Sequence, residues 1–168
     1  MKKILLILAI FSLATMVQAQ KFAYVDTDYI LNKIPEFQQA QDKLDALSAD
    51  WQKEIENKYA DVEQMYRAYQ QEQVLLTDEM KTKREEAIIK KENDAKNLQQ
   101  KYFGPQGELY SKRQGLVKPI QDKIHDGIQQ LAANNKYQVV FDSSSDLIML
   151  YKNNNLDKSD KVLDLMGY

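Results

Sequence analysis

The sequence of 168 residues lacks cysteine and contains only one histidine, one tryptophan, three prolines and five glycines. Without cysteine the chain can form no disulfide and has no thiol on which a lipid anchor could be built. The single histidine, His125, adjoins Asp126, but neighbours in sequence point in different directions on a helix. No nucleophile elbow or phosphate-binding loop is present. We therefore expect no catalytic residue, no metal site and no cofactor.

The first 19 residues have the composition of a secretory signal peptide. Two lysines precede an apolar run over residues 4–17, and the small residues Val17 and Ala19 stand where cleavage would leave Gln20 first. The run is too short for a membrane span. Cleavage would leave 21 basic and 25 acidic residues, a net charge of −4. We therefore expect an exported chain that does not bind nucleic acid.

The scarcity of helix breakers is greatest over residues 36–103, which contain no glycine or proline. Pro35, just before this stretch, suits the first position of a helix because it lacks an amide hydrogen. Apolar residues then recur at steps of three or four, an average of about 3.6, which is the period of one helical face. The sequence therefore predicts a long amphipathic helix of coiled-coil type. The stripe consists of Phe37, Ala40, Leu44, Leu47, Trp51, Ile55, Tyr59, Val62, Tyr66 and Tyr69.

A second, thinner stripe predicts that the chain returns as an antiparallel hairpin arm. Thr77 can cap the returning helix, whose first turn holds Asp78 and Glu79. We expect the arm to span residues 36–117, with its tip near residues 75–79. The stripe consists of Met80, Ala87 or Ile88, Ala95, Leu98, Tyr102, Leu109, Leu116, Val117, Ile120, Ile124, Ile128 and Leu131.

A rival turn lies at FGPQG, residues 103–107, where two glycines flank Pro105. Turning there would leave most of the first stripe exposed to water. We therefore expect a kink in the returning helix at this point. Counting back from the tip places Gly104 beside Trp51, so the largest side chain is expected to face the break.

The segments outside the arm predict three short strands. The apolar runs Tyr137–Phe141 and Leu147–Tyr151, joined by the turn-forming residues DSSSD, predict a β-hairpin. Residues Phe22–Val25 predict another strand. We expect a mainly α protein in which a long helical hairpin projects from a small β body.

Short helices complete this body. The first is expected after the N-terminal strand, capped by Asp26 or Thr27 and ending before Pro35. The second is expected at the C-terminus, capped by Ser159 or Asp157.

A body of residues 20–35 and 118–168 can bury little apolar surface by itself. The edges of its strands would recruit other strands, and several copies could close a barrel. Self-association through the strands is the expected result. The candidate oligomerisation residues are Phe22, Tyr24, Val139, Val140, Phe141, Leu147, Ile148 and Leu150.

The distal arm carries amphipathic and adaptable side chains and three bases, which suit weak, distributed binding of a client chain. The candidate residues are Met65, Tyr66, Tyr69, Leu75, Leu76, Met80, Lys81, Lys83 and Arg84. A second interpretation stays open, in which the two tyrosines close the hairpin and the bases, followed by Glu85 and Glu86, form a solvated helix face.

The segments AYVDTDYIL and IPEF, the charged hairpin, LVKPIQDKI and the final YQVVFDSSSDLIMLYKNNNLDKSDKVLDLMGY together resemble the OmpH/Skp family of periplasmic chaperones. This resemblance covers essentially the whole mature chain. It implies a homotrimer joined through its β body, with helical arms around a cavity that holds unfolded outer-membrane proteins without ATP. Peripheral contact with a membrane surface is a further expectation.

The chain departs from the best-known member of that family in one respect. That member is strongly basic, whereas this chain is mildly acidic. The difference favours apolar over electrostatic capture of clients. Two other functions stay open, a structural coiled-coil spacer, which would not bind unfolded chains, and an adaptor, which would bind one folded partner with a defined stoichiometry.

Overall fold

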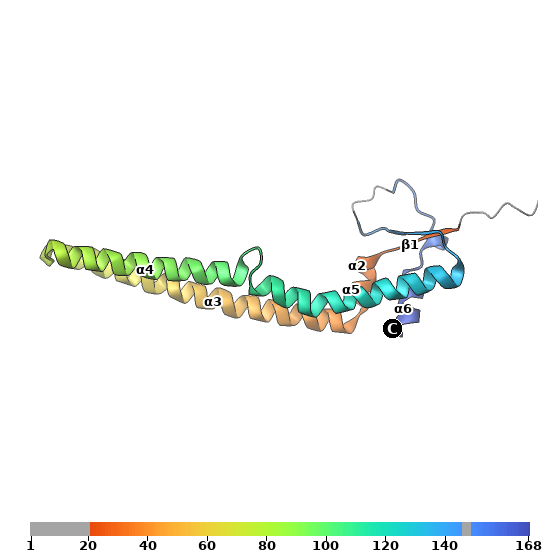
Figure 1. The fold of residues 1–168 in the computed structure, drawn as a ribbon, viewed down its shortest axis with the longest axis horizontal. Coiled ribbons are helices and arrows are strands. Elements are labelled where there is room, and N and C mark those ends of the chain that lie inside the picture. Colours follow the sequence, from red (N-terminus) through yellow and green to blue (C-terminus); the bar gives the residue numbers. More distant parts are fainter. Residues whose placement is uncertain (1–20, 146–148) are drawn as a thin grey trace, which may run out of the picture. The chain divides into compact units, whose positions relative to one another are not determined.

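We analysed a computed structural model, which describes residues 21–145 and 149–168 (Figure 1). The proposed signal peptide, together with Leu147 and Ile148, lies outside the described residues. The chain divides into two compact units. The arm unit is Ile34–Gln121, and the body unit combines the described residues up to Lys33 with Asp122–Tyr168. The fold is mostly helical with a small sheet, which confirms the predicted class at that level.

The arm unit is built from two long helices that lie side by side (Figure 1). Helix α3 spans Pro35–Glu72, with the proline at its first position, and helix α4 spans Asp78–Phe103. Hydrogen bonds join them, including one from the Tyr102 hydroxyl to the Glu54 carboxylate (2.9 Å) and one from the Tyr59 hydroxyl to the Gln99 side chain (3.4 Å). An ion pair joins Arg84 to Glu72 at 3.2 Å nearer the turn. From the first pair to the third, the residue number rises along α3 and falls along α4, so the helices run antiparallel.

The connection between these helices is short. A 3-10 turn, η2, covers Gln73–Leu75, and Leu76 then takes an extended conformation. The Thr77 side chain accepts a hydrogen bond from the Met80 amide at 3.3 Å, so the predicted cap is confirmed. Because Thr77 satisfies an amide that would otherwise lack a partner, it fixes where α4 begins.

The returning half of the arm is broken rather than kinked. Helix α4 ends at Phe103, residues 104–107 form a loop, and helix α5 spans Glu108–Asn135, so the predicted kink is wrong. A Cβ atom added to Gly104 would lie 2.3 Å from the Gln100 carbonyl oxygen, and one added to Gly107 would lie 2.7 Å from the Tyr102 carbonyl oxygen. Such close backbone approach lets the chain leave and re-enter a helix within four residues.

The side chain of Trp51 packs at this break, as the sequence predicted. Its ring stacks on Tyr102, with ring centroids 4.6 Å apart and an interplanar angle of 5°. The ring of Phe103 meets Trp51 edge to face at 6.4 Å. The last turn of α4 is therefore held against α3 by aromatic contacts.

The body unit contains a two-stranded parallel sheet. Strand β1 (Phe22–Val25) pairs with strand β2 (Val139–Asp142), with Phe22 opposite Val139 and Tyr24 opposite Phe141. The predicted hairpin between the runs near 137–151 is therefore wrong, because β2 pairs with β1 and residues 149–151 form no strand. The Asp142 carboxylate accepts a hydrogen bond from the Ser144 amide at 3.0 Å, so a turn does follow β2.

Three short helical segments also belong to the body. Helix α2 spans Thr27–Lys33, the 3-10 turn η3 spans Asn154–Leu156, and helix α6 spans Ser159–Met166. Helices α5 and α6 approach closely, since a Cβ atom on Gly127 would lie 3.1 Å from the Met166 side chain. The fully buried apolar side chains of this unit include those of Ala23, Val25, Ile30 and Val162.

Within the described part of the chain, no helix has the length and apolar character that crossing a membrane would require.

Candidate functional site

The described residues form no group of three or more side chains placed to hold a metal ion. His125 is exposed on α5, and its Nε2 atom lies 2.8 Å from the Gln129 side-chain nitrogen. This environment is that of a surface residue, without the buried acidic partner that orients a general base.

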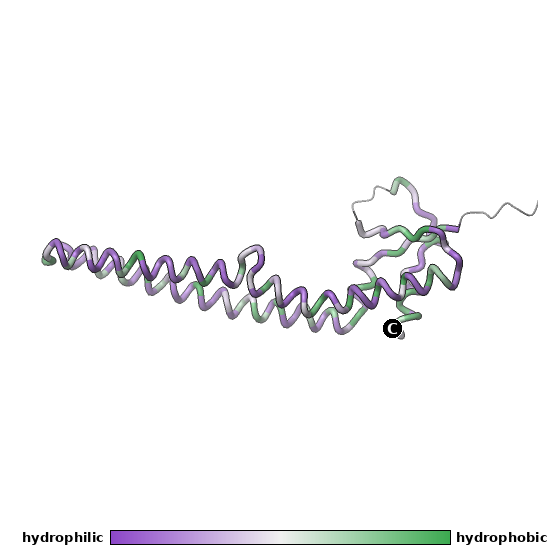
Figure 2. Tube along the Cα trace, viewed as in Figure 1, coloured by the Kyte–Doolittle hydropathy of each residue, from purple (hydrophilic) through white to green (hydrophobic). Residues whose placement is uncertain are grey.

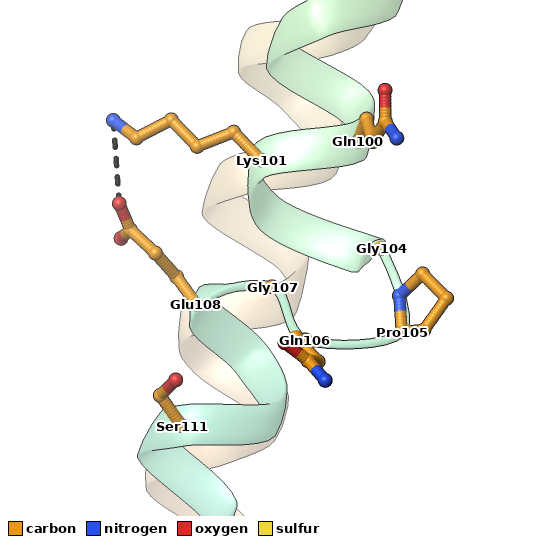
Figure 3. A pocket seen from close by; sticks show the side chains of 8 residues that line it. All are labelled: Gln100, Lys101, Gly104, Pro105, Gln106, Gly107, Glu108 and Ser111. Carbon is orange, nitrogen blue, oxygen red and sulfur yellow. Dashed lines mark ion pairs between the residues drawn. The ribbon is translucent and has the colours of Figure 1, made fainter.

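A hollow of about 620 Å³ lies beside the loop at residues 104–107 (Figure 3). Lys101 and Glu108 reach toward each other across it and form an ion pair at 3.2 Å. The hydrogen bond to Glu108 raises the pKa of the Lys101 ammonium, with the charge of Glu108 as the second cause. The Lys101 ammonium therefore stays protonated at neutral pH. The rest of the lining is glycine, proline, glutamine and serine, which suits a structural loop rather than a reactive pocket.

The distal part of the arm, residues 56–94, contains no fully buried side chain. On α3 the buried residues are Ala40, Leu44 and Ile55, all nearer its N-terminus, and on α4 they are Ala95 and Tyr102. Figure 2 shows hydrophilic and hydrophobic residues alternating along both helices. The distal arm is thus a two-helix layer in which apolar side chains remain within reach of solvent.

The turn at the tip carries the most exposed apolar side chains of the arm. Val74 and Leu75 are each 84% exposed, and Met80 is 49% exposed, whereas Leu76 is half-buried. The sequence analysis named Leu75, Leu76 and Met80 but missed Val74. The signal was present in the uninterrupted run VLL directly before the capping residue.

The candidate residues along the helices differ in exposure and in hydrogen bonding. Tyr66 is 50% exposed and Met65 is half-buried. The half-buried Tyr69 donates a hydrogen bond from its hydroxyl to Glu85, and this bond is the first cause that raises the pKa of the Tyr69 phenol. Tyr69 therefore ties the two helices together. Ile89, which the sequence analysis missed, is 56% exposed and was hidden in the doublet of isoleucines.

The three basic candidates at the tip all have acidic partners. Lys81 pairs with Asp78 at 3.4 Å, and Lys83 pairs with Glu79 at 2.6 Å, both within the first turns of α4. Arg84 pairs with Glu72 of α3 at 3.2 Å, as described above. Exposed pairs of this kind contribute little stability, but they leave a surface with little excess positive charge.

The sheet of the body has one open face. In a parallel pair, residues opposite each other in register point to the same face. Phe22, Tyr24, Val139 and Phe141 therefore share one face. Three of these side chains are substantially exposed (51% for Phe22, 47% for Val139 and 41% for Phe141), and only Tyr24 is buried.

The opposite face of the sheet packs inward. Val140 is half-buried and lies opposite the fully buried Ala23 in the register. Leu150 is 97% exposed and lies outside any strand. These positions separate the oligomerisation candidates into an outer set and an inner set.

Polar side chains fix the end of the sheet. The Asp142 carboxylate accepts hydrogen bonds from the Thr27 hydroxyl (2.6 Å) and amide (3.2 Å) and from the Ser144 hydroxyl (2.8 Å) and amide. Burial by itself would raise the pKa of Asp142, but these hydrogen bonds outweigh it and hold the pKa below its ordinary value. The charged carboxylate therefore ties β2 to the start of α2.

Known proteins resemble this chain in sequence pattern and in fold. The model of the family described as outer membrane protein (OmpH-like) matches residues 21–166. Among solved structures, the chain is similar to an OmpH-like protein of Caulobacter crescentus CB15, described as a candidate outer membrane chaperone. The TM-score is 0.68 at 14% identity, over 86% of this chain and 82% of that one, which shows a shared fold. No curated protein matches the sequence. The resemblance found in the sequence is confirmed, and the chain belongs to the OmpH-like outer membrane protein family.

Proposed function

We propose that this chain is exported to the periplasm and acts there as an ATP-independent holdase chaperone for unfolded outer-membrane proteins. The observation that carries the proposal is the exposure of apolar side chains along the distal arm. The similar protein of Caulobacter crescentus, described as a candidate outer membrane chaperone, supports the chaperone part of the proposal.

Distributed apolar contacts suit a holdase because capture must be tight in sum and weak at each point. A flexible client loses conformational entropy when it binds, and it must later leave without an energy source. Val74, Leu75, Tyr66 and Ile89 are exposed at separate positions of the hairpin. Several such contacts, repeated on several arms, would hold one client by multivalency.

Assembly into a homotrimer is the second part of the proposal. A parallel sheet is normally covered on both faces, and two strands of four residues are few for an independent sheet. The outer face with Phe22, Val139 and Phe141 is therefore the surface that we expect other copies to cover. The arms of three copies would then bound the cavity in which the client is held.

The direct test dilutes a urea-unfolded outer-membrane β-barrel protein into buffer with the purified protein and without nucleotide. Light scattering then measures aggregation of the client. We expect the wild-type protein to suppress it. Replacing Met65, Leu75, Leu76 and Met80 together by serine should abolish this suppression while the oligomeric state remains unchanged.

A matched control carries serine at three exposed polar positions of the same helices, Gln64, Gln71 and Thr82. It should suppress aggregation as well as the wild type does. If the wild-type protein leaves aggregation unchanged, the holdase proposal is wrong and the spacer or adaptor functions become the better hypotheses.

A further inference from the structure

The arm hairpin has two flanks, one on each side of the seam between α3 and α4, and contacts across the seam identify them. On the first flank the Tyr102 hydroxyl donates to Glu54, and Arg84 pairs with Glu72. Residues 54 and 72 of α3 are separated by the same distance in sequence as residues 84 and 102 of α4, which is about five helical turns. Both contacts therefore lie on the same side, which we name the Glu54 flank.

The opposite side, the Tyr59 flank, is identified by the hydrogen bond from the Tyr59 hydroxyl to Gln99. Tyr59 follows Glu54 by five residues, which turns it by about 140° around α3. Lys96 belongs to this flank as well. The hydrogen bond to Glu92 is the first cause that raises the pKa of the Lys96 ammonium, and the charge of Tyr59 is a further cause, so Lys96 lies beside Tyr59.

The exposed apolar side chains in the middle of the arm lie on the Tyr59 flank. Apart from Met80 in the first turn of α4, the exposed large apolar side chains of the two helices are Tyr66 and Ile89. Tyr66 follows Tyr59 by seven residues and Ile89 precedes Lys96 by seven, about two turns in each case, so each keeps to the same side. Because the helices run antiparallel, both steps lead the same way along the arm. Tyr66 and Ile89 are therefore at the same level, on either side of the seam.

The charges that border these two exposed side chains are largely compensated. Glu63 pairs with Arg67 at 2.6 Å, and Glu92 pairs with Lys96 at 2.7 Å. The carboxylate of Glu85, also nearby, accepts a hydrogen bond from a tyrosine hydroxyl. This part of the flank offers apolar and hydrogen-bonding contact with little excess charge. Its complement is a chain segment that carries few charges.

The Glu54 flank has a different chemistry. Lys58 follows Glu54 by four residues and Lys91 follows Arg84 by seven, so both lie on this side. Both lysines are exposed, and within the described ranges 21–145 and 149–168 neither forms an ion pair. The apolar side chain of Met65 on this flank is half-buried. The complement of this flank is an acidic segment.

We propose that the arm binds unfolded clients through the Tyr59 flank, where Tyr66 and Ile89 hold extended client segments that are apolar or aromatic and carry few charges. This inference rests on the proposed function and adds to it the side of the arm and the chemistry of the segment. A tyrosine offers a rigid apolar ring together with a hydroxyl that can donate to or accept from the backbone of an extended segment. The Glu54 flank then closes the hairpin without touching the client.

Photo-crosslinking tests the side directly. Benzoylphenylalanine is placed at one exposed polar position of α3 on each flank, either at Gln70, eleven residues after Tyr59, or at Asp61, seven residues after Glu54. Either distance is close to a whole number of turns, so each probe lies on the flank of its reference residue. A urea-unfolded outer-membrane β-barrel protein, diluted into each variant, should crosslink strongly at position 70 and weakly at position 61.

Client affinity supplies the second measurement. Replacing two apolar contacts by Tyr66→Gln with Ile89→Gln should raise the client Kd about 10-fold, since each loses apolar surface that the client would cover. The control, Lys58→Gln with Lys91→Gln, removes two charges from the other flank and should change the Kd by less than about 2-fold. Circular dichroism verifies that both double variants remain helical.

Three outcomes decide the matter. Crosslinks at position 70, with affinity lost only in the Tyr66 and Ile89 variant, support the proposal. Equal crosslinking on the two flanks, stronger crosslinking at position 61, or a larger loss of affinity in the lysine variant overturns it and leaves the holdase function standing. A wild-type protein that neither suppresses aggregation nor crosslinks to the client from either position overturns both.

Discussion

The distal arm and the body both expose apolar side chains, but the two regions differ in how many buried side chains lie beneath the exposed ones. In the arm, residues 56–94 contain no fully buried side chain, and the exposed groups are spaced along two helices. In the body, three exposed apolar side chains share one sheet face above residues that are fully buried, such as Ala23 and Val25. A fixed face over a packed core suits one defined partner, whereas spaced groups on a thinly packed hairpin suit many weak partners.

The largest effect should come from placing a charge on either side of the body sheet. Val140→Asp puts a carboxylate on the inner face, opposite Ala23, and should unfold the body at a cost of several kcal/mol. Val139→Asp puts the same charge on the outer face, where the side chain is 47% exposed, and should block assembly but spare the fold. Circular dichroism and sedimentation equilibrium separate the two results.

If both variants unfold alike, or if both assemble normally, the division of the sheet into an inner and an outer face is wrong.

Hydrogen exchange of the backbone amides should be faster in the weakly packed helices than in the strongly packed ones. The distal arm lacks fully buried side chains, whereas α5 buries Ile124 and Leu131. We expect amides of residues 65–95 to exchange about 100-fold faster than those of residues 120–131, a difference of about 3 kcal/mol in opening free energy. Equal protection in both segments would indicate a rigid spacer and contradict an adaptable arm.

The aromatic cluster at the break should be the strongest local contact of the arm. Trp51→Ala removes the stack on Tyr102 and the edge contact with Phe103. Since Trp51 is only half-buried, we expect a loss of about 2 kcal/mol, below the cost at a fully buried site. Faster exchange confined to the last turn of α4 and to the facing turn of α3 would show this. The control is Tyr110→Ala, on α5, where the side chain is 50% exposed and the loss should be much smaller.

The sequence predicted the parts of the fold that depend on local patterns. Helical periodicity placed α3, and the capping preference of threonine placed the start of α4. The sheet depends on contacts between distant segments, and here the prediction failed. The signal for a turn after Phe141 was real, since the Asp142 carboxylate accepts a hydrogen bond from the Ser144 amide, but a turn does not decide which strand becomes the neighbour.

The candidate residues divide in the same way. The sequence predicted an apolar turn at the tip but did not distinguish its members: Leu75 is exposed, whereas the adjacent Leu76 is half-buried. The ion pair between Arg84 and Glu72 joins two helices, and no spacing rule within one helix could reveal it.

A smaller effect is expected from the polar end of the body sheet. Asp142 has a pKa held below its ordinary value, so its stabilising effect is complete above about pH 4 and is lost as the pH falls through the lowered value. Asp142→Asn should cost about 1 kcal/mol at pH 7, after allowance for solvent screening, and progressively less in acid.

Urea unfolding of the wild type and of Asp142→Asn at pH 7, 4 and 3 measures this difference. The control, Asp164→Asn, removes an exposed ion pair with Lys161 and should have little effect at any of these pH values. A cost of Asp142→Asn that is the same at pH 7 and at pH 3 would mean that the carboxylate charge does not hold β2 to α2.

The smallest effect should come from single substitutions on the arm, and it distinguishes apolar from electrostatic capture of clients. Leu76→Ser removes one apolar side chain among many, so client affinity should fall by about 1 kcal/mol or less. Salt should also have little effect between low and physiological ionic strength, because Lys81, Lys83 and Arg84 are each paired with an acidic residue. Fluorescence titration of an unfolded client at two salt concentrations measures both quantities. A steep loss of affinity with salt, together with a large loss when the three bases are replaced by glutamine, would show that positive charge captures the client and that the apolar surface is secondary.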